Sequence, residues 1–245
     1  MSKVSPDAKT ALCFVRALLD LRPARRRFFA FLQAGGLSIA TVAWAEGVPT
    51  PSEPRVQSRE FDLYQRGQWE FSLESAYTFR NVPNPFVSAV KGYIRNPNPL
   101  HYSFLTQAIA ARYRVTNPDG PWLFRGSLQV SATMIGTAIV EGPESHFFGV
   151  ALGFRYDFVQ PGARLVPFFE GRGGPGVIDS SGIKTGQYQD FIFTYLINVG
   201  LRYDFSPRCS VMISVMDQHF SNAGQTKEAN GIDSLGVSIG ALTRF

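Results

Sequence analysis

Large apolar residues alternate with polar or small ones from Trp69 almost to the end of the 245-residue chain. Neighbouring side chains of a strand point to opposite faces, so this period of two predicts β-strands with one apolar face. The pattern is clearest from Phe148 to Phe158 and poorest in the segment that follows it. Eight strands are predicted, near residues 68–79, 105–115, 122–131, 148–158, 164–173, 191–205, 211–221 and 233–245.

The apolar faces are rich in aromatic residues, which favours an all-β, eight-stranded antiparallel transmembrane β-barrel whose outer wall faces lipid. Such a sheet must close, because an open edge would leave backbone groups unpaired in hydrocarbon. A soluble barrel or sandwich with the aromatic faces inside is the alternative. Eight strands enclose only side chains, so we expect paired charges inside rather than a porin-like channel. The expected interior charges are Glu70, Glu74, Arg112, Arg125, Arg155, Glu170, Arg172 and Arg202.

The predicted connections alternate in length. Short links that contain Pro are expected at 116–120, 159–162 and 206–208, and longer ones at 80–102, 135–146 and 174–190. In outer-membrane barrels the short turns are periplasmic and the long loops external. Both barrel termini are therefore expected on the periplasmic side, and the strand at 211–221 is expected to run outward.

The formal net charge of +5 arises entirely from residues 1–45, since the remainder of the chain is balanced. The high isoelectric point therefore gives no reason to expect a nucleic-acid partner. A basic patch at 22–27, an apolar run at 28–42 and Ala43-Trp44-Ala45 predict a secretory signal peptide over 1–45. An N-terminal membrane anchor is the alternative. We expect a periplasmic N-terminal lead at 46–66 and the barrel at 67–245, with Cys209 as the single cysteine after the leader.

The last two predicted strands carry the candidate chemistry. His219 and Ser221 share one face of the first, and an Asn-, Gly- and Ala-rich link predicts a hairpin that returns Asp233 beside His219. These residues could form a Ser-His-Asp triad. Asp217 lies on the same face and is a rival partner for His219. A polar strand end at the level of the lipid headgroups is the non-catalytic interpretation.

Two other motifs are explained by the barrel. Gly236-Val-Ser238-Ile-Gly240 matches the G-x-S-x-G pattern of hydrolases, but that pattern requires a following helix, and Ser238 is expected to line the barrel. The glycine-rich run from Gly171 to Gly176 has a proline and no following helix. It is therefore interpreted as a strand end and loop rather than a phosphate site.

The segments His219-Phe-Ser221-Asn222-Ala-Gly224 and Asn230-Gly231-Ile232-Asp233 resemble the signature of the lipid A 3-O-deacylase (PagL) family. The resemblance implies an outer-membrane hydrolase in which His219 is the base and Ser221 the nucleophile. Asp233 stands where the family has a Glu that orients the histidine. The Asn222 amide and the Gly224 N–H are the local candidates for oxyanion donors.

The resemblance gives a specific expectation of function. It implies hydrolysis of the ester-linked 3-hydroxyacyl chain at position 3 of lipid A in lipopolysaccharide, at a site facing the outer leaflet, without metal or cofactor. The residues by themselves indicate only a lipid ester as substrate. The terminal Phe245 resembles the aromatic residue that such barrels present to the barrel assembly machinery. A non-enzymatic structural or adhesive barrel is the alternative function.

Overall fold

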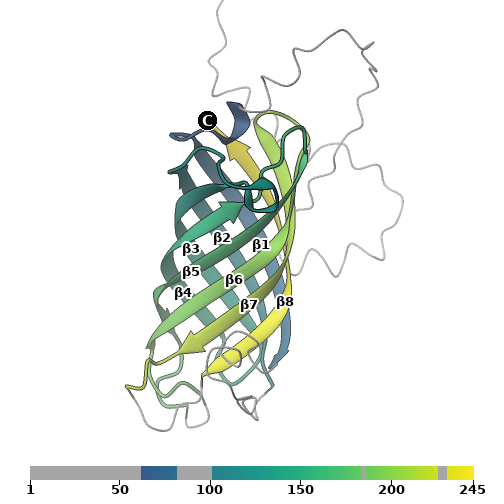
Figure 1. The fold of residues 1–245 in the computed structure, drawn as a ribbon. Coiled ribbons are helices and arrows are strands. Elements are labelled where there is room, and N and C mark those ends of the chain that lie inside the picture. The colour runs from purple at the N-terminus through teal and green to yellow at the C-terminus, as the bar shows by residue number, and fades with distance from the viewer. Residues whose placement is uncertain (1–61, 82–100, 184–185, 226–230) are drawn as a thin grey trace, which may run out of the picture. The chain divides into compact units, whose positions relative to one another are not determined.

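The structure, a computed structural model, describes residues 62–81, 101–183, 186–225 and 231–245. Its strands form a closed antiparallel barrel in which each strand pairs with the next and β8 pairs with β1 (Figure 1). The predicted eight-stranded barrel is thereby confirmed. The strands are β1 (Trp69–Asn81), β2 (Ser103–Arg114), β3 (Ser127–Glu141), β4 (His146–Asp157), β5 (Leu165–Ile178), β6 (Phe191–Asp204), β7 (Cys209–Ser221) and β8 (Ile232–Arg244). The predicted signal peptide and most of the predicted lead lie outside the described residues.

The outer wall carries the large apolar residues, as the alternation predicts. Trp69, Leu152 and Phe154 keep 48%, 72% and 48% of their surface exposed. Every strand exposes large apolar residues, which contradicts the soluble alternative, because that alternative requires the apolar faces to pack inside. In the described part of the chain, no helix has the length and apolar composition needed to cross a membrane.

The half of the barrel interior near the C-terminus is filled by buried ion pairs. Glu70 contacts Arg114, Arg202 and Arg244 at 2.9, 3.0 and 3.1 Å, and none of the four side chains is more than 4% exposed. Isolated charges would be costly to bury, and mutual pairing offsets much of that cost. Side chains thus fill this part of the lumen, as expected for eight strands.

The other half of the interior contains an apolar cluster, which the polar inward faces of the predicted strands did not indicate. Phe104, Phe147 and Phe220 are fully buried there and belong to one cluster. Their rings pack with centroids 5.1 Å (Phe104 to Phe220) and 4.8 Å (Phe147 to Phe220) apart. These rings are fully buried, so their volumes must fit together within the barrel.

A 3₁₀ turn, η1 (Asp62–Tyr64), closes the charged end of the barrel. The Tyr64 hydroxyl donates a hydrogen bond to Asp204, and its ring lies within 4.8 to 5.2 Å of the Arg114, Arg202 and Arg244 guanidinium groups. Burial and the neighbouring carboxylates raise the pKa of Tyr64 well above its ordinary value, so the phenol stays protonated. The end of the predicted lead is therefore part of the folded barrel.

Three boundary predictions were wrong. Trp122–Phe124 forms an exposed 3₁₀ turn, η2, because Pro121 and Gly120 interrupt the strand pattern, and Arg125 caps this turn instead of entering the lumen. β5 continues through Gly176 to Ile178, so the glycine-rich run is strand, and the following connection starts at Asp179. β3 extends to Glu141, which shortens its link to β4 to residues 142–145.

The connections at the end opposite the C-terminus are held by two carboxylates. Asp179 accepts hydrogen bonds from the backbone of Ser145 and His146. Partial burial acts to raise the pKa of Asp179, but the hydrogen bonds from Ser145 and His146 outweigh it and lower the pKa to about 2. Glu144 is buried and accepts a hydrogen bond from the Tyr102 hydroxyl at 2.9 Å. This rim is therefore ordered by contacts between loops.

Candidate active site

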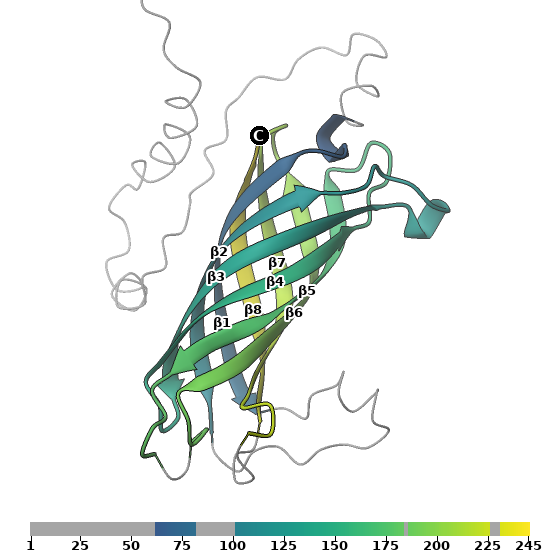
Figure 2. The same ribbon diagram turned by 90° about the vertical axis from the view of Figure 1, so that its left-hand side faces the viewer.

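The hairpin of β7 and β8 places three reactive side chains at one end of the barrel. β7 ends at Ser221 and β8 begins at Ile232, and both of these strand ends lie opposite the end that carries the C-terminus (Figures 1 and 2). Within the hairpin, His219 pairs directly with Asp233. The predicted return of Asp233 to the side of His219 is thus present in the fold.

Phe220 fixes the direction in which its neighbours point. It is fully buried in the apolar cluster of the interior, whereas His219 and Ser221 on either side face outward and are partly exposed. A slip of one residue would exchange the two faces and expose Phe220. The buried ring therefore holds both reactive side chains on the outer wall.

His219 and Asp233 form a close polar pair. Nδ1 of His219 lies 2.6 Å from Oδ1 of Asp233, and the two side chains are 12% and 13% exposed. A carboxylate at this distance accepts a hydrogen bond from Nδ1–H, so that Nε2 becomes the basic nitrogen of the neutral ring. Asp217, the rival partner, is buried on β7 opposite Ile197 and Leu235.

Two further residues restrain the His219 ring. Tyr195 pairs with His219 across β6 and β7, and the two rings stack with centroids 4.5 Å apart and an interplanar angle of 16°. The Tyr195 hydroxyl lies 3.5 Å from Oδ1 of Asp233, at the long limit of a hydrogen bond. A Cβ on Gly231 would lie 2.7 Å from Cε1 of His219. Any side chain at Gly231 would displace the imidazole.

The turn after Ser221 has a left-handed backbone, with φ of 56° at Ala223 and 76° at Gly224. The Ala223 N–H donates a hydrogen bond to Oγ of Ser221 at 3.1 Å. The Gly224 N–H donates to Oδ1 of Asn222 at 3.0 Å, and Asn222 is 4% exposed. The two predicted oxyanion donor groups, the Asn222 amide and the Gly224 N–H, are thus hydrogen-bonded to each other. The backbone N–H that contacts Ser221 is that of Ala223.

Comparison with known families identifies the family to which this chain belongs. A family model described as lipid A 3-O-deacylase (PagL) matches residues 107–241, more than half of the chain and inclusive of His219, Ser221 and Asp233. The chain belongs to the lipid A 3-O-deacylase (PagL) family. Membership places it among the lipid A deacylases, hydrolases of the outer membrane.

Solved structures similar to this PagL-family chain include several membrane barrels. The outer membrane enzyme PagL has 19% sequence identity, with 69% of this chain and 97% of that chain covered and a TM-score of 0.47. Neisserial surface protein A has 13% identity, with 73% and 97% covered and a TM-score of 0.46. No curated protein matches the chain. The family assignment therefore rests on the match of the sequence to the family model.

Tyr195 is the residue of the candidate site that sequence reasoning missed. Alternation placed it on the outward face of β6, but only the register of β6 against β7 brings it onto His219. Ser238 is buried and faces the lumen, as expected, and so takes no part in the site. Among the residues that the structure describes, no three His, Cys, Asp or Glu side chains gather as a metal site.

Proposed function

We propose that this PagL-family barrel is a serine esterase that hydrolyses the ester-linked 3-hydroxyacyl chain at position 3 of lipid A. The observation that supports this most directly is the contact of 2.6 Å between His219 and Asp233. His219 lies two residues before Ser221 on the same outward face of β7. A carboxylate, an imidazole and a hydroxyl in this order are the parts of a Ser-His-Asp triad.

In the proposed reaction, Nε2 of His219 accepts the Oγ proton of Ser221 while Oγ bonds to the ester carbonyl carbon. The resulting imidazolium is stabilised by Asp233. It returns the proton to the sugar oxygen as the carbon–oxygen bond breaks, and an acyl-enzyme remains on Ser221. Water then attacks the acyl-enzyme with His219 as base, which releases a 3-hydroxy fatty acid and regenerates Ser221.

The tetrahedral intermediate requires donors for its oxyanion, and we assign this role to the Asn222 amide and the Gly224 N–H. Because the Gly224 N–H already donates to Oδ1 of Asn222, it would have to leave that partner during the reaction. The Ala223 N–H lies 3.1 Å from Oγ of Ser221 and is a third donor at hand. Tyr195 acts as a positioning residue, because its ring stacks on His219.

The outward direction of the site supports a substrate that approaches sideways from the bilayer. At this end of the barrel the strands are connected by residues 82–102, 142–145, 179–190 and 222–231, and at the other end by residues 115–126, 158–164 and 205–208, so most of the connecting residues belong to the end that carries the site. Long external loops and short periplasmic turns are typical of outer-membrane barrels. We therefore place the site at the external rim, in contact with the outer leaflet, where lipopolysaccharide resides.

The assay for this function uses the purified barrel in detergent with a defined lipid A. We expect release of one 3-hydroxy fatty acid and a product whose new free hydroxyl is at position 3 of the sugar. A product deacylated only at another position would contradict the assigned bond. A folded barrel that releases no fatty acid would favour the structural or adhesive alternative.

A further inference from the structure

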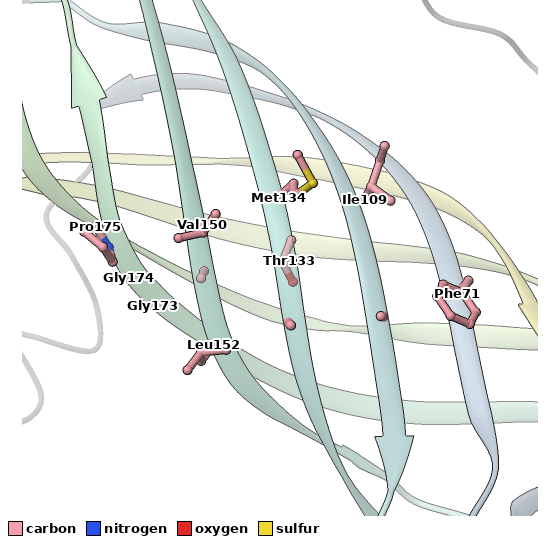
Figure 3. A pocket seen from close by; sticks show the side chains of 12 residues that line it. Phe71, Ile109, Thr133, Met134, Val150, Leu152, Gly173, Gly174 and Pro175 are labelled. Carbon is pink, nitrogen blue, oxygen red and sulfur yellow. The ribbon is translucent and has the colours of Figure 1, made fainter.

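The connection from β5 to β6 lies at the same rim of the barrel as the candidate site (Figures 1 and 2). Polar contacts begin there, because the apolar wall ends with β5. Gly173, Gly174 and Pro175 still lie among the apolar side chains of the outer wall (Figure 3). β5 ends at Ile178, and the backbone of the next residues is held by hydrogen bonds to polar side chains. The connection is therefore a polar part of the rim rather than a part of the lipid-facing wall.

A buried carboxylate, that of Glu144, holds this connection from the β3–β4 side of the rim. Glu144 is 3% exposed, and its Oε1 accepts hydrogen bonds from the Ser180 hydroxyl at 3.0 Å and from the Gln187 N–H at 2.8 Å. A Cβ on Gly186 would lie 2.1 Å from the same oxygen, so the chain can approach the carboxylate this closely only with a glycine there. The middle of the connection is thus packed on a fixed buried group.

Tyr188 turns the chain from this buried carboxylate toward the candidate site. Its φ of 64° lies in the left-handed region, which a residue with a bulky side chain rarely adopts. Gln187, just before it, is buried against Glu144, whereas the side chain of Gln189, just after it, reaches the turn that follows Ser221. Such a backbone conformation persists only where the surrounding contacts hold it, and here contacts on both sides do so.

The Gln189 side chain bridges β6 and the turn that follows Ser221. Its Nε2 donates to the Phe191 carbonyl oxygen at 2.6 Å and to Oε1 of Gln225 at 2.8 Å. The Gln225 N–H in turn donates to the Asn222 carbonyl oxygen at 3.1 Å. A chain of hydrogen bonds thus runs from β6 to the residue whose amide is assigned to the oxyanion.

We propose that Gln189 is a positioning residue, which fixes the turn from Asn222 to Gln225 and so places the Asn222 amide for the oxyanion. The inference rests on the proposed function. The Gln225 N–H bonds the backbone of Asn222 and leaves its side-chain amide available to the oxyanion. Donors stabilise an oxyanion best when their support is rigid, and the bridge connects this turn to a strand of the barrel.

Methionine substitutions test the proposal, because methionine keeps the length of glutamine but lacks the amide that forms the bridge. We expect Gln189→Met and Gln225→Met each to lower kcat roughly 2-fold to 12-fold, as for the loss of one hydrogen bond, with KM unchanged. The double variant should lose no more than the larger single loss, because both residues act through one contact. In the Asn222→Ala background, Gln189→Met should lower kcat by a smaller factor than in the wild type.

Gln160→Met is the matched control. Gln160 is also partly exposed, and its Nε2 donates to the Trp122 carbonyl oxygen at 2.6 Å, but it lies at the opposite end of the barrel. This variant should keep the wild-type kcat, and heat-modifiable gel migration would verify that every variant is folded.

The assay is release of 3-hydroxy fatty acid from purified lipid A in detergent. Three results would each overturn the role of Gln189 while the esterase stands: single losses that multiply in the double variant, an equal loss in Gln160→Met, or the same factor for Gln189→Met with and without the Asn222 amide. If the wild-type barrel releases no fatty acid, the proposed function fails and the role of Gln189 with it.

Discussion

Replacing Asp233 by Asn removes the charge opposite His219 and preserves the size of the side chain and the strand pairing. The two side chains are 2.6 Å apart and only 12% and 13% exposed, so the bulk solvent screens their interaction weakly. A hydrogen bond to a charged group contributes about 1.5–3 kcal/mol. Its loss from the transition state alone would lower kcat roughly 10-fold to 10²-fold.

The tautomer of His219 enlarges this effect. The Asn amide can donate to Nδ1, which would place the ring proton on Nε2, where the base must accept one from Ser221. The corresponding Asp to Asn change in a protease triad lowers kcat about 10⁴-fold. We therefore expect Asp233→Asn to lower kcat by a factor between about 10² and 10⁴. KM should change little, because Asp233 is assigned no contact with substrate.

Release of 3-hydroxy fatty acid by purified, folded barrels measures this loss. Asp233→Glu should keep substantial activity, because it preserves the charge. Asp217→Asn is the matched control, since Asp217 shares the outward face of β7 and is buried. A silent Asp233→Asn together with a damaging Asp217→Asn would refute the assigned triad.

Substitutions at four other positions test the account. Tyr195→Phe should stay within about threefold of wild type, and Tyr195→Leu should lose roughly 2-fold to 12-fold in kcat, as expected for a stacking energy of about 0.5–1.5 kcal/mol; equal activities would show that the ring does not position His219. Asn222→Ala and Asn222→Asp should both lower kcat about 10²-fold if the amide donates to the oxyanion. Full activity of Asn222→Asp would instead show that Asn222 only accepts the hydrogen bond from Gly224 in the turn. Phe154→Asp should destabilise the barrel in the membrane by roughly 2 kcal/mol, whereas Phe154→Leu should assemble normally, as gel migration would show. Equal assembly of the two variants would contradict a lipid-facing wall. Glu70→Gln should destabilise the barrel by about 3–5 kcal/mol in denaturant unfolding, because three arginines lose the charge of their partner, and an unchanged midpoint would refute this role of the ion pairs.

Period-two alternation was sufficient to predict the strands because lipid selects one face so strongly. The predicted strand boundaries were wrong where another constraint acted on the backbone. Pro121 converted an apparently alternating segment into a turn, and β5 extended through Pro175 because its glycines pack closely on the neighbouring strand: a Cβ on Gly174 would lie 2.1 Å from the Val150 carbonyl oxygen.

The site was predictable only in part. His219, Ser221 and Asp233 lie on one hairpin, so a short link and alternation were enough to bring the first and last together. Tyr195 comes from another strand, and its position depends on the register between β6 and β7, which no local pattern encodes. The apolar interior around Phe220 was missed for a related reason, because facing residues from several strands together decide how a closed lumen is filled.

The mass of lipid A from cells that express the full chain tests the central claim most directly. The wild-type barrel should remove the mass of one 3-hydroxyacyl group, and Ser221→Ala, which differs by a single oxygen, should leave lipid A intact while the barrel still folds in the outer membrane. Unchanged lipid A in cells with folded wild-type barrel, or full deacylation by Ser221→Ala, would contradict the proposed serine esterase.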